Sequence, residues 1–158
     1  MSPIARIFVA ASALAAIIAS PASAQDYSLN PTYGTASLTS GFTPDPYVVN
    51  VRSGGSINAA GIGSPCAGFI ANAPDVRLQF SAGSLPLIIS AASSSDTTLV
   101  VNAPDGRWYC DDDSGNNGLN PMVRFNNPSS GQYDIWVGTY GNASTQPAQL
   151  NISELYTQ

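Results

Sequence analysis

The chain has 158 residues, a net charge of −5 at pH 7 and no histidine. Without histidine it cannot form a Ser-His-Asp or Cys-His nucleophile, a histidine general base or a histidine-ligated zinc site. Its basic residues are 5 arginines, too few to give the clustered positive charge that nucleic acids and anionic lipids require, so we expect neither partner.

The first segment, residues 1–24, has the pattern of a secretory signal peptide. Arg6 supplies a positive charge, residues 7–18 form an apolar run, and Ala22-Ser23-Ala24 matches the small residues before a cleavage site. The apolar run is shorter than the roughly 20 residues that cross a bilayer. We therefore expect a periplasmic or secreted protein that begins at Gln25 and does not insert into the membrane after signal removal. A retained N-terminal anchor is the alternative.

The amino-acid pattern of the segment after the signal changes at residue 47. Residues 25–46 are polar and rich in proline and glycine, which predicts an extended lead-in with a short strand over 34–38. From residue 47, β-favouring runs alternate with Gly, Pro, Asn and Ser clusters about every ten residues, as in a sandwich or barrel. The predicted strands are 47–52, 56–60, 66–71, 76–80, 85–91, 97–102, 107–111, 122–126, 132–139 and 149–155. We predict an all-β protein with a single domain over 47–158.

The two cysteines, Cys66 and Cys110, predict one disulfide, because an isolated pair in an oxidising compartment usually forms a bridge. Two free thiols, or a bridge between molecules, are the alternatives. Neither cysteine lies in a Cys-x-x-Cys motif, so we expect no redox activity. Trp108 shares a strand face with Cys110, and this arrangement predicts that Trp108 is buried in the core.

Alternation along 132–139 gives that strand one apolar face, while Asp134 and Trp136 share the other face. Two interpretations stand for Trp136. Either a loop or the lead-in covers it, or it serves with Tyr140 as an exposed surface on which a ligand stacks. Trp136 and Tyr140 are therefore the candidate ligand-binding residues.

The loop after strand 107–111 carries the candidate metal ligands Asp111, Asp112, Asp113, Asn116 and Asn117. Adjacent carboxylates repel one another unless water screens them or a cation neutralises them, and Asp and Asn oxygens suit Ca²⁺. The spacing does not match the EF-hand pattern. In the alternative interpretation these side chains bond their own backbone and stay solvated. We expect no cofactor, with calcium as the alternative.

Four motifs resemble the bacterial pre-peptidase C-terminal domain. They are Asp-Thr-Thr-Leu-Val-Val at 96–101, Pro-Asp-Gly at 104–106, Asp-Asp-Ser-Gly at 112–115 and Ser-Gly-Gln-Tyr-Asp-Ile-Trp-Val-Gly at 130–138. The resemblance covers residues 76–155. It implies a small β-sandwich of jelly-roll type, of the kind appended to secreted proteases and other exported enzymes. For this chain the corresponding architecture has about eight to ten short antiparallel strands.

These observations together predict a non-catalytic exported module that binds or assists a protein or glycan at the cell envelope. A structural envelope protein that self-associates is the alternative. A hydrolase is a third hypothesis, which the missing histidine disfavours. Glycoside hydrolysis would need two carboxyl groups held about 5–10 Å apart across a cleft, and the sequence gives no sign of such a pair.

Overall fold

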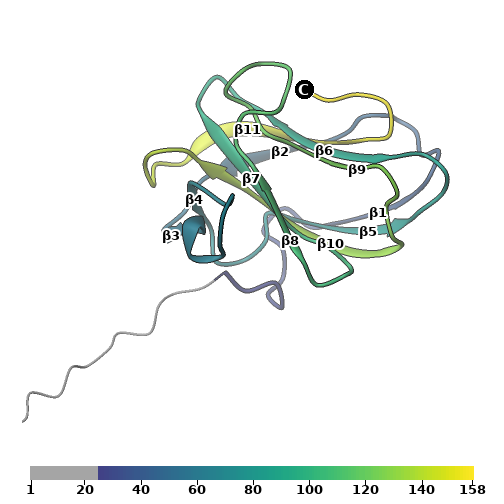
Figure 1. Ribbon diagram of the computed structural model, residues 1–158, viewed down its shortest axis with the longest axis horizontal. Helices are drawn as coiled ribbons and strands as arrows, with labels where there is room; N and C mark the ends of the chain where they lie inside the picture. Colours follow the sequence, from purple (N-terminus) through teal and green to yellow (C-terminus); the bar gives the residue numbers. More distant parts are fainter. Residues whose placement is uncertain (1–24) are drawn as a thin grey trace, which may run out of the picture.

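A computed structural model describes residues 25–158, which form a sandwich of two β-sheets (Figure 1). The predicted signal peptide, 1–24, lies outside the described residues. The strands are β1 Thr35–Thr39, β2 Tyr47–Ser53, β3 Ile57–Asn58, β4 Phe69–Ile70, β5 Val76–Ser81, β6 Leu87–Ala92, β7 Thr97–Asn102, β8 Trp108–Asp111, β9 Met122–Phe125, β10 Gly131–Thr139 and β11 Gln146–Ser153. A 3₁₀ turn, η1, spans Ala59–Gly61. The prediction of an all-β sandwich is confirmed.

The strands divide into two layers that face each other in Figure 1. Sheet A has the order β1-β5-β10-β4-β3, and β7 pairs with β10 and with β8. Sheet B has the order β2-β11-β6-β9. The pairing of β1 with β5 is parallel, which differs from the antiparallel arrangement that the sequence predicted. Because β1 belongs to sheet A, the sheet also takes in part of the predicted lead-in. No helix within residues 25–158 is long and apolar enough to cross a membrane.

The main core lies between the two sheets and follows the alternation that the sequence predicted. Tyr133, Ile135 and Val137 of β10 point into it, and Leu150 and Ile152 of β11 meet them from sheet B. These side chains are 0–1% exposed. Burying such side chains is the main favourable term in folding, at about 1.5–3 kcal/mol each.

A second, smaller cluster lies on the outer face of sheet A, away from sheet B. Trp136 is at its centre and is surrounded by buried apolar side chains that come from β7 and from the segment around β3, η1 and β4; these are Ile57, Ala59, Cys66, Ile70 and Val100. Trp108 packs against this cluster but stays half-buried. The prediction that Trp108 is buried in the core is therefore met only in part, since the ring packs on the cluster but is itself partly exposed.

The predicted disulfide between Cys66 and Cys110 is present, with a Cα–Cα distance of 4.9 Å. It joins the segment before β4 to β8 and closes over the Trp136 cluster. Because β8 is paired only with β7 in the sheet, the bridge gives it a second attachment.

Asp75 forms a buried junction between β5 and β10. Its N–H donates to the Ile135 carbonyl at 2.8 Å, and its Oδ2 accepts the Val137 N–H at 2.7 Å. The Asp75 side chain thus takes the place of a main-chain acceptor for β10 beyond Val76, the last β5 residue that pairs with it. The residue is 2% exposed. Burial raises the pKa of Asp75 to about 7, and the hydrogen bond from Val137 acts in the opposite direction.

Replacing both Cys66 and Cys110 with serine should lower the free energy of unfolding. The bridge closes a loop of 44 residues, for which the chain-entropy model gives about 3–4 kcal/mol. Urea denaturation of the oxidised proteins measures the difference. In a reducing agent the two proteins should unfold at similar midpoints, and equal midpoints under oxidising conditions would contradict the prediction.

Stability should fall as the pH rises from 4 to 7, because the folded pKa of Asp75, about 7, lies above its ordinary value of 3.8. Between those values the folded state binds one proton more than the unfolded state, so stability decreases by about 1.4 kcal/mol per pH unit. The titration of Asp75 should change the free energy of unfolding little at pH values below 3.8 or above about 7. In Asp75→Asn the slope should be lost, whereas Asp105→Asn, at an exposed turn, should keep it. Denaturant titrations at several pH values test this, and a slope unchanged in Asp75→Asn would refute it.

Candidate functional site

The acidic loop places its first carboxylate in a structural role. Asp111 ends β8, and its Oδ2 accepts the N–H of Ser114 at 2.8 Å and the N–H of Met122 at 2.9 Å. Its Oδ1 accepts the Ser114 hydroxyl at 2.6 Å. These bonds close the connection between β8 and β9. For Asp111 the structure therefore matches the alternative interpretation, in which the side chain bonds its own loop.

The other predicted metal ligands point to different parts of the molecule. Asn116 donates from Nδ2 to the Thr157 carbonyl at 2.9 Å and so holds the C-terminal segment. Asn117 lines a hollow on sheet B. Within residues 25–158, no three His, Cys, Asp or Glu side chains converge as a metal site would require. Calcium binding by this loop remains the alternative to the expectation of no cofactor.

Asp112 and Asp113 lie close enough to Asp96 to affect its titration. Partial burial raises the pKa of Asp96, and the negative charges of Asp113 and Asp112 raise it further. The loop thus concentrates negative charge at the end of the sandwich where β7 begins.

The two candidate ligand-binding aromatics have different surroundings. Trp136 is 0% exposed, so the interpretation of this ring as a ligand-stacking surface is wrong. The β3–β4 segment and Trp108 cover it, in agreement with the alternative of a covering loop. Tyr140 is 48% exposed at the end of β10 and lines neither of the two hollows described next. A role for Tyr140 in binding remains a prediction.

A hollow of about 410 Å³ lies on the outer face of sheet A, and we call it the aromatic hollow. It is lined by Tyr27, Asn102, Ala103, Pro104, Gly106, Trp108, Gln132 and Asp134. Its volume falls within the range of about 300–1,000 Å³ that is usual for small-ligand sites.

Two rings form the aromatic part of the hollow, and Ala103 and Pro104 add to its apolar lining. Trp108 and Tyr27 lie edge to face, with centroids 6.4 Å apart and planes at 62°. Trp108 is supported from beneath by Trp136, whose centroid is 5.5 Å away. Tyr27 is 53% exposed, and its main chain is fixed by Arg77, whose Nη2 donates to the Tyr27 carbonyl at 2.6 Å. The rings are therefore accessible and held in place.

A row of polar side chains on β5 and β10 lies beside the rings, and we call it the polar ladder; its β10 members, Gln132 and Asp134, line the floor of the hollow. Gln79 donates to Gln132 at 3.0 Å, and Gln132 donates to Asp134 at 2.7 Å. Arg77 Nε completes the row by donating to Asp134 Oδ1 at 2.7 Å. Gln79 faces Gln132 and Arg77 faces Asp134 in the strand register, so the antiparallel pairing itself creates the ladder.

The rim of the aromatic hollow is the turn between β7 and β8. The Gly106 N–H donates to the Ala103 carbonyl at 2.9 Å, and Gly106 has a φ of +75°, a conformation that glycine adopts at no steric cost. The chain therefore makes a tight turn at Pro104-Asp105-Gly106. It places Pro104 and Gly106 at the mouth of the hollow.

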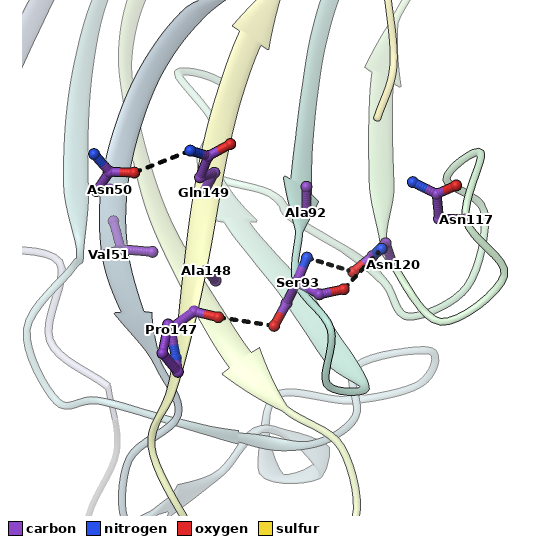
Figure 2. A pocket seen from close by; sticks show the side chains of 9 residues that line it. All are labelled: Asn50, Val51, Ala92, Ser93, Asn117, Asn120, Pro147, Ala148 and Gln149. Carbon is purple, nitrogen blue, oxygen red and sulfur yellow. Dashed lines mark hydrogen bonds between the residues drawn. The ribbon is translucent and has the colours of Figure 1, made fainter.

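A second hollow, of about 480 Å³, lies on sheet B, and we call it the amide hollow (Figure 2). Figure 2 shows that its amides are joined to neighbouring groups, with Gln149 donating to Asn50 at 3.1 Å and Asn120 bonded to Ser93. Asn117 stands apart from these pairs on its own loop. No aromatic ring lines this hollow. Its polar groups are largely satisfied by the protein, which makes it the weaker candidate for ligand binding.

Calcium at about 10 mM should leave the melting temperature unchanged, although it would saturate a typical extracellular site of about 10⁻⁴–10⁻³ M. The reason is that both oxygens of Asp111 already accept hydrogen bonds. Asp111→Asn should lower stability by about 1–3 kcal/mol, since bonds to a charged acceptor are weakened. Asp112→Asn/Asp113→Asn is the matched control and should not lower it. Melts with calcium, magnesium and chelator test this, and a calcium-specific rise that the control variant abolishes would identify a cation site.

No family model and no curated protein matches the chain. Among solved structures, it is similar to the pre-peptidase C-terminal domain of a collagenase from Bacillus anthracis, at 14% identity and a TM-score of 0.44, over 79% of this chain and 100% of that one. It is also similar to PliG from Aeromonas hydrophila, a periplasmic lysozyme inhibitor of g-type lysozyme, at 15% identity and a TM-score of 0.39, over 75% and 96% of the two chains. The first of these is a domain of the family that the sequence motifs resemble.

Proposed function

We propose that this protein is an exported, non-catalytic module that binds a protein or glycan of the cell envelope in the aromatic hollow. The observation that carries the proposal is the pair formed by the exposed Tyr27 and the half-buried Trp108 beside the polar ladder. Concave sites with aromatic walls and a few placed polar groups are the usual form of binding sites. Exposed aromatic rings that are rigidly held also lose little conformational freedom on binding.

Export is supported by the disulfide and by the signal-like segment at residues 1–24. Disulfides of this structural kind persist in oxidising compartments such as the periplasm and the extracellular space. We therefore place the protein in the periplasm or outside the cell.

The absence of catalysis is supported by the composition and by the state of the carboxyl groups. The chain has no histidine. Asp75 has a pKa raised to about 7, as a general acid would need, but it is 2% exposed and bonded to a main-chain N–H. In the aromatic hollow, Asp134 is paired with Arg77 and has a side chain that is 2% exposed. Neither carboxyl group is available to transfer a proton to a ligand.

Capture experiments with the purified exported protein and solubilised envelope fractions test the proposal. Tyr27→Ala should reduce capture of the envelope ligand, because it removes one wall of the hollow. Tyr156→Ala is the matched control, since Tyr156 is 56% exposed and lines neither hollow. Tyr140→Ala tests the remaining sequence prediction in the same assay.

The outcome that contradicts the proposal is equal capture by wild type and Tyr27→Ala, which would place binding elsewhere on the surface. If the immobilised protein retained only further copies of itself, self-association would be the better description. Sizing chromatography at several protein concentrations measures that alternative directly.

A further inference from the structure

We propose that the ligand of the aromatic hollow is a neutral glycan, a proposal that rests on the function inferred above. Three properties of the hollow support it: the balance of its charges, the pairing of the strands beneath it, and the hydrogen-bonding groups next to its rings.

The charged groups of the aromatic hollow neutralise one another. On the floor, Asp134 accepts hydrogen bonds from Arg77 Nε at 2.7 Å and from Gln132 Nε2 at 2.7 Å. At the rim, Asp105 lies 3.9 Å from the Arg107 guanidinium. The remaining polar side-chain groups of the lining residues are uncharged: the amides of Asn102 and Gln132, the hydroxyl of Tyr27 and the indole N–H of Trp108. Among the residues that line the hollow, Asp134 is the charged one and it is already paired, while Arg107 and Asp105 lie outside the lining, so the lining favours a ligand that is polar but uncharged.

The strands beneath the polar ladder leave no unpaired main chain for an extended peptide. Arg77 and Gln79 lie on β5, which pairs with β1 on one side and with β10 on the other. Asp134 lies on β10, between Arg77 of β5 and Asn102 of β7. Peptides that bind as an added strand require a free sheet edge. The floor of the hollow is therefore sheet interior. The strand β8 has one unpaired edge, but it lines the hollow only with its first residue, Trp108. This arrangement disfavours that mode of protein recognition.

The groups that remain match the two kinds of surface on a sugar ring. One face of a pyranose presents C–H groups, which pack on the indole of Trp108 and the ring of Tyr27. The rim of a pyranose carries hydroxyls that both donate and accept, as amides do. Gln132 keeps one N–H after donating to Asp134, and Asn102 uses its Nδ2 for the Arg107 carbonyl at 3.4 Å, leaving its Oδ1 as an acceptor. The amide hollow of sheet B lacks this combination because no ring lines it.

Calorimetric titration of the exported protein with neutral tetrasaccharides tests the inference. The probes are cellotetraose, laminaritetraose and chitotetraose, with tetragalacturonate as a charged control. We expect binding of a neutral probe and weaker or absent binding of the charged one. Tyr27→Ala should lower the association constant about threefold to tenfold, the size expected for one aromatic contact. Tyr156→Ala should leave it unchanged. Tryptophan emission gives a second readout, because Trp108 is half-buried whereas Trp136 is fully buried.

A second arm needs no purified sugar. The envelope fraction is treated with protease, with periodate, which cleaves the vicinal diols of cellulose-type glucans, or with laminarinase and chitinase, which degrade glycans that lack such diols, and the Tyr27-dependent capture is measured again. Loss after a glycan-degrading treatment alone supports the glycan. Loss after protease with survival after every glycan-degrading treatment overturns the glycan inference and leaves the proposed binding function intact. If no capture depends on Tyr27, both the inference and the proposed function are wrong.

Discussion

Trp136 projects from β10 away from the main core, and the burial of this ring organises the outer face of sheet A. A Trp ring removes about 150–250 Å² from water, which at about 25 cal/mol per Å² contributes about 4–6 kcal/mol. Its Nε1 has no hydrogen-bond partner among the described residues, which costs about 1–3 kcal/mol. The apolar term is the larger of the two. The ring must therefore be covered, and the cover comes from the β3–β4 segment, β8 and the disulfide.

That cover is also what creates the aromatic hollow. The disulfide fixes β8 over Trp136, and Trp108 is then held with one side against Trp136 and the other facing solvent. Arg77 uses one guanidinium to pair with Asp134 and to hold the main chain of Tyr27. The interactions that stabilise this face of the sheet thus also position the exposed rings. A ligand that binds there meets a surface already ordered by folding, which lowers the entropic cost of association.

The sequence predicted the structure best where the signal is a local pattern, such as a run of strand-favouring residues or the alternation of apolar and polar residues. Strand β7 has the predicted bounds, 97–102, and the alternation along β10 separated the core face from the face that carries Asp134 and Trp136. The predicted strands at 56–60 and 66–71 shrink to two residues each, because the chain there follows the shape of Trp136 and the disulfide. The strand propensities of individual residues do not indicate such long-range packing. The meeting of Tyr27 with Trp108 was also unpredictable, since the lead-in has no periodicity that would place its aromatic residue.

The tetrapeptide Asn-Ala-Pro-Asp occurs twice in the sequence, at 72–75 and at 102–105, and its two aspartates differ in surroundings and in pKa. In one copy Asp105 sits in an exposed turn, where the N–H of Arg107 holds its pKa below the usual value. In the other copy Asp75 is buried immediately before the first residue of β5, and its pKa is raised to about 7. The two pKa values differ because of the position of β10. Its pairing with β5 stops at Ile135, and the N–H of Val137, two residues further on, donates to the Asp75 carboxylate instead of to a β5 carbonyl. The carboxyl group with the raised pKa, that of Asp75, therefore serves to complete the pairing of sheet A. The groups that would face a ligand are instead the aromatic rings and amides on the outer face of sheet A.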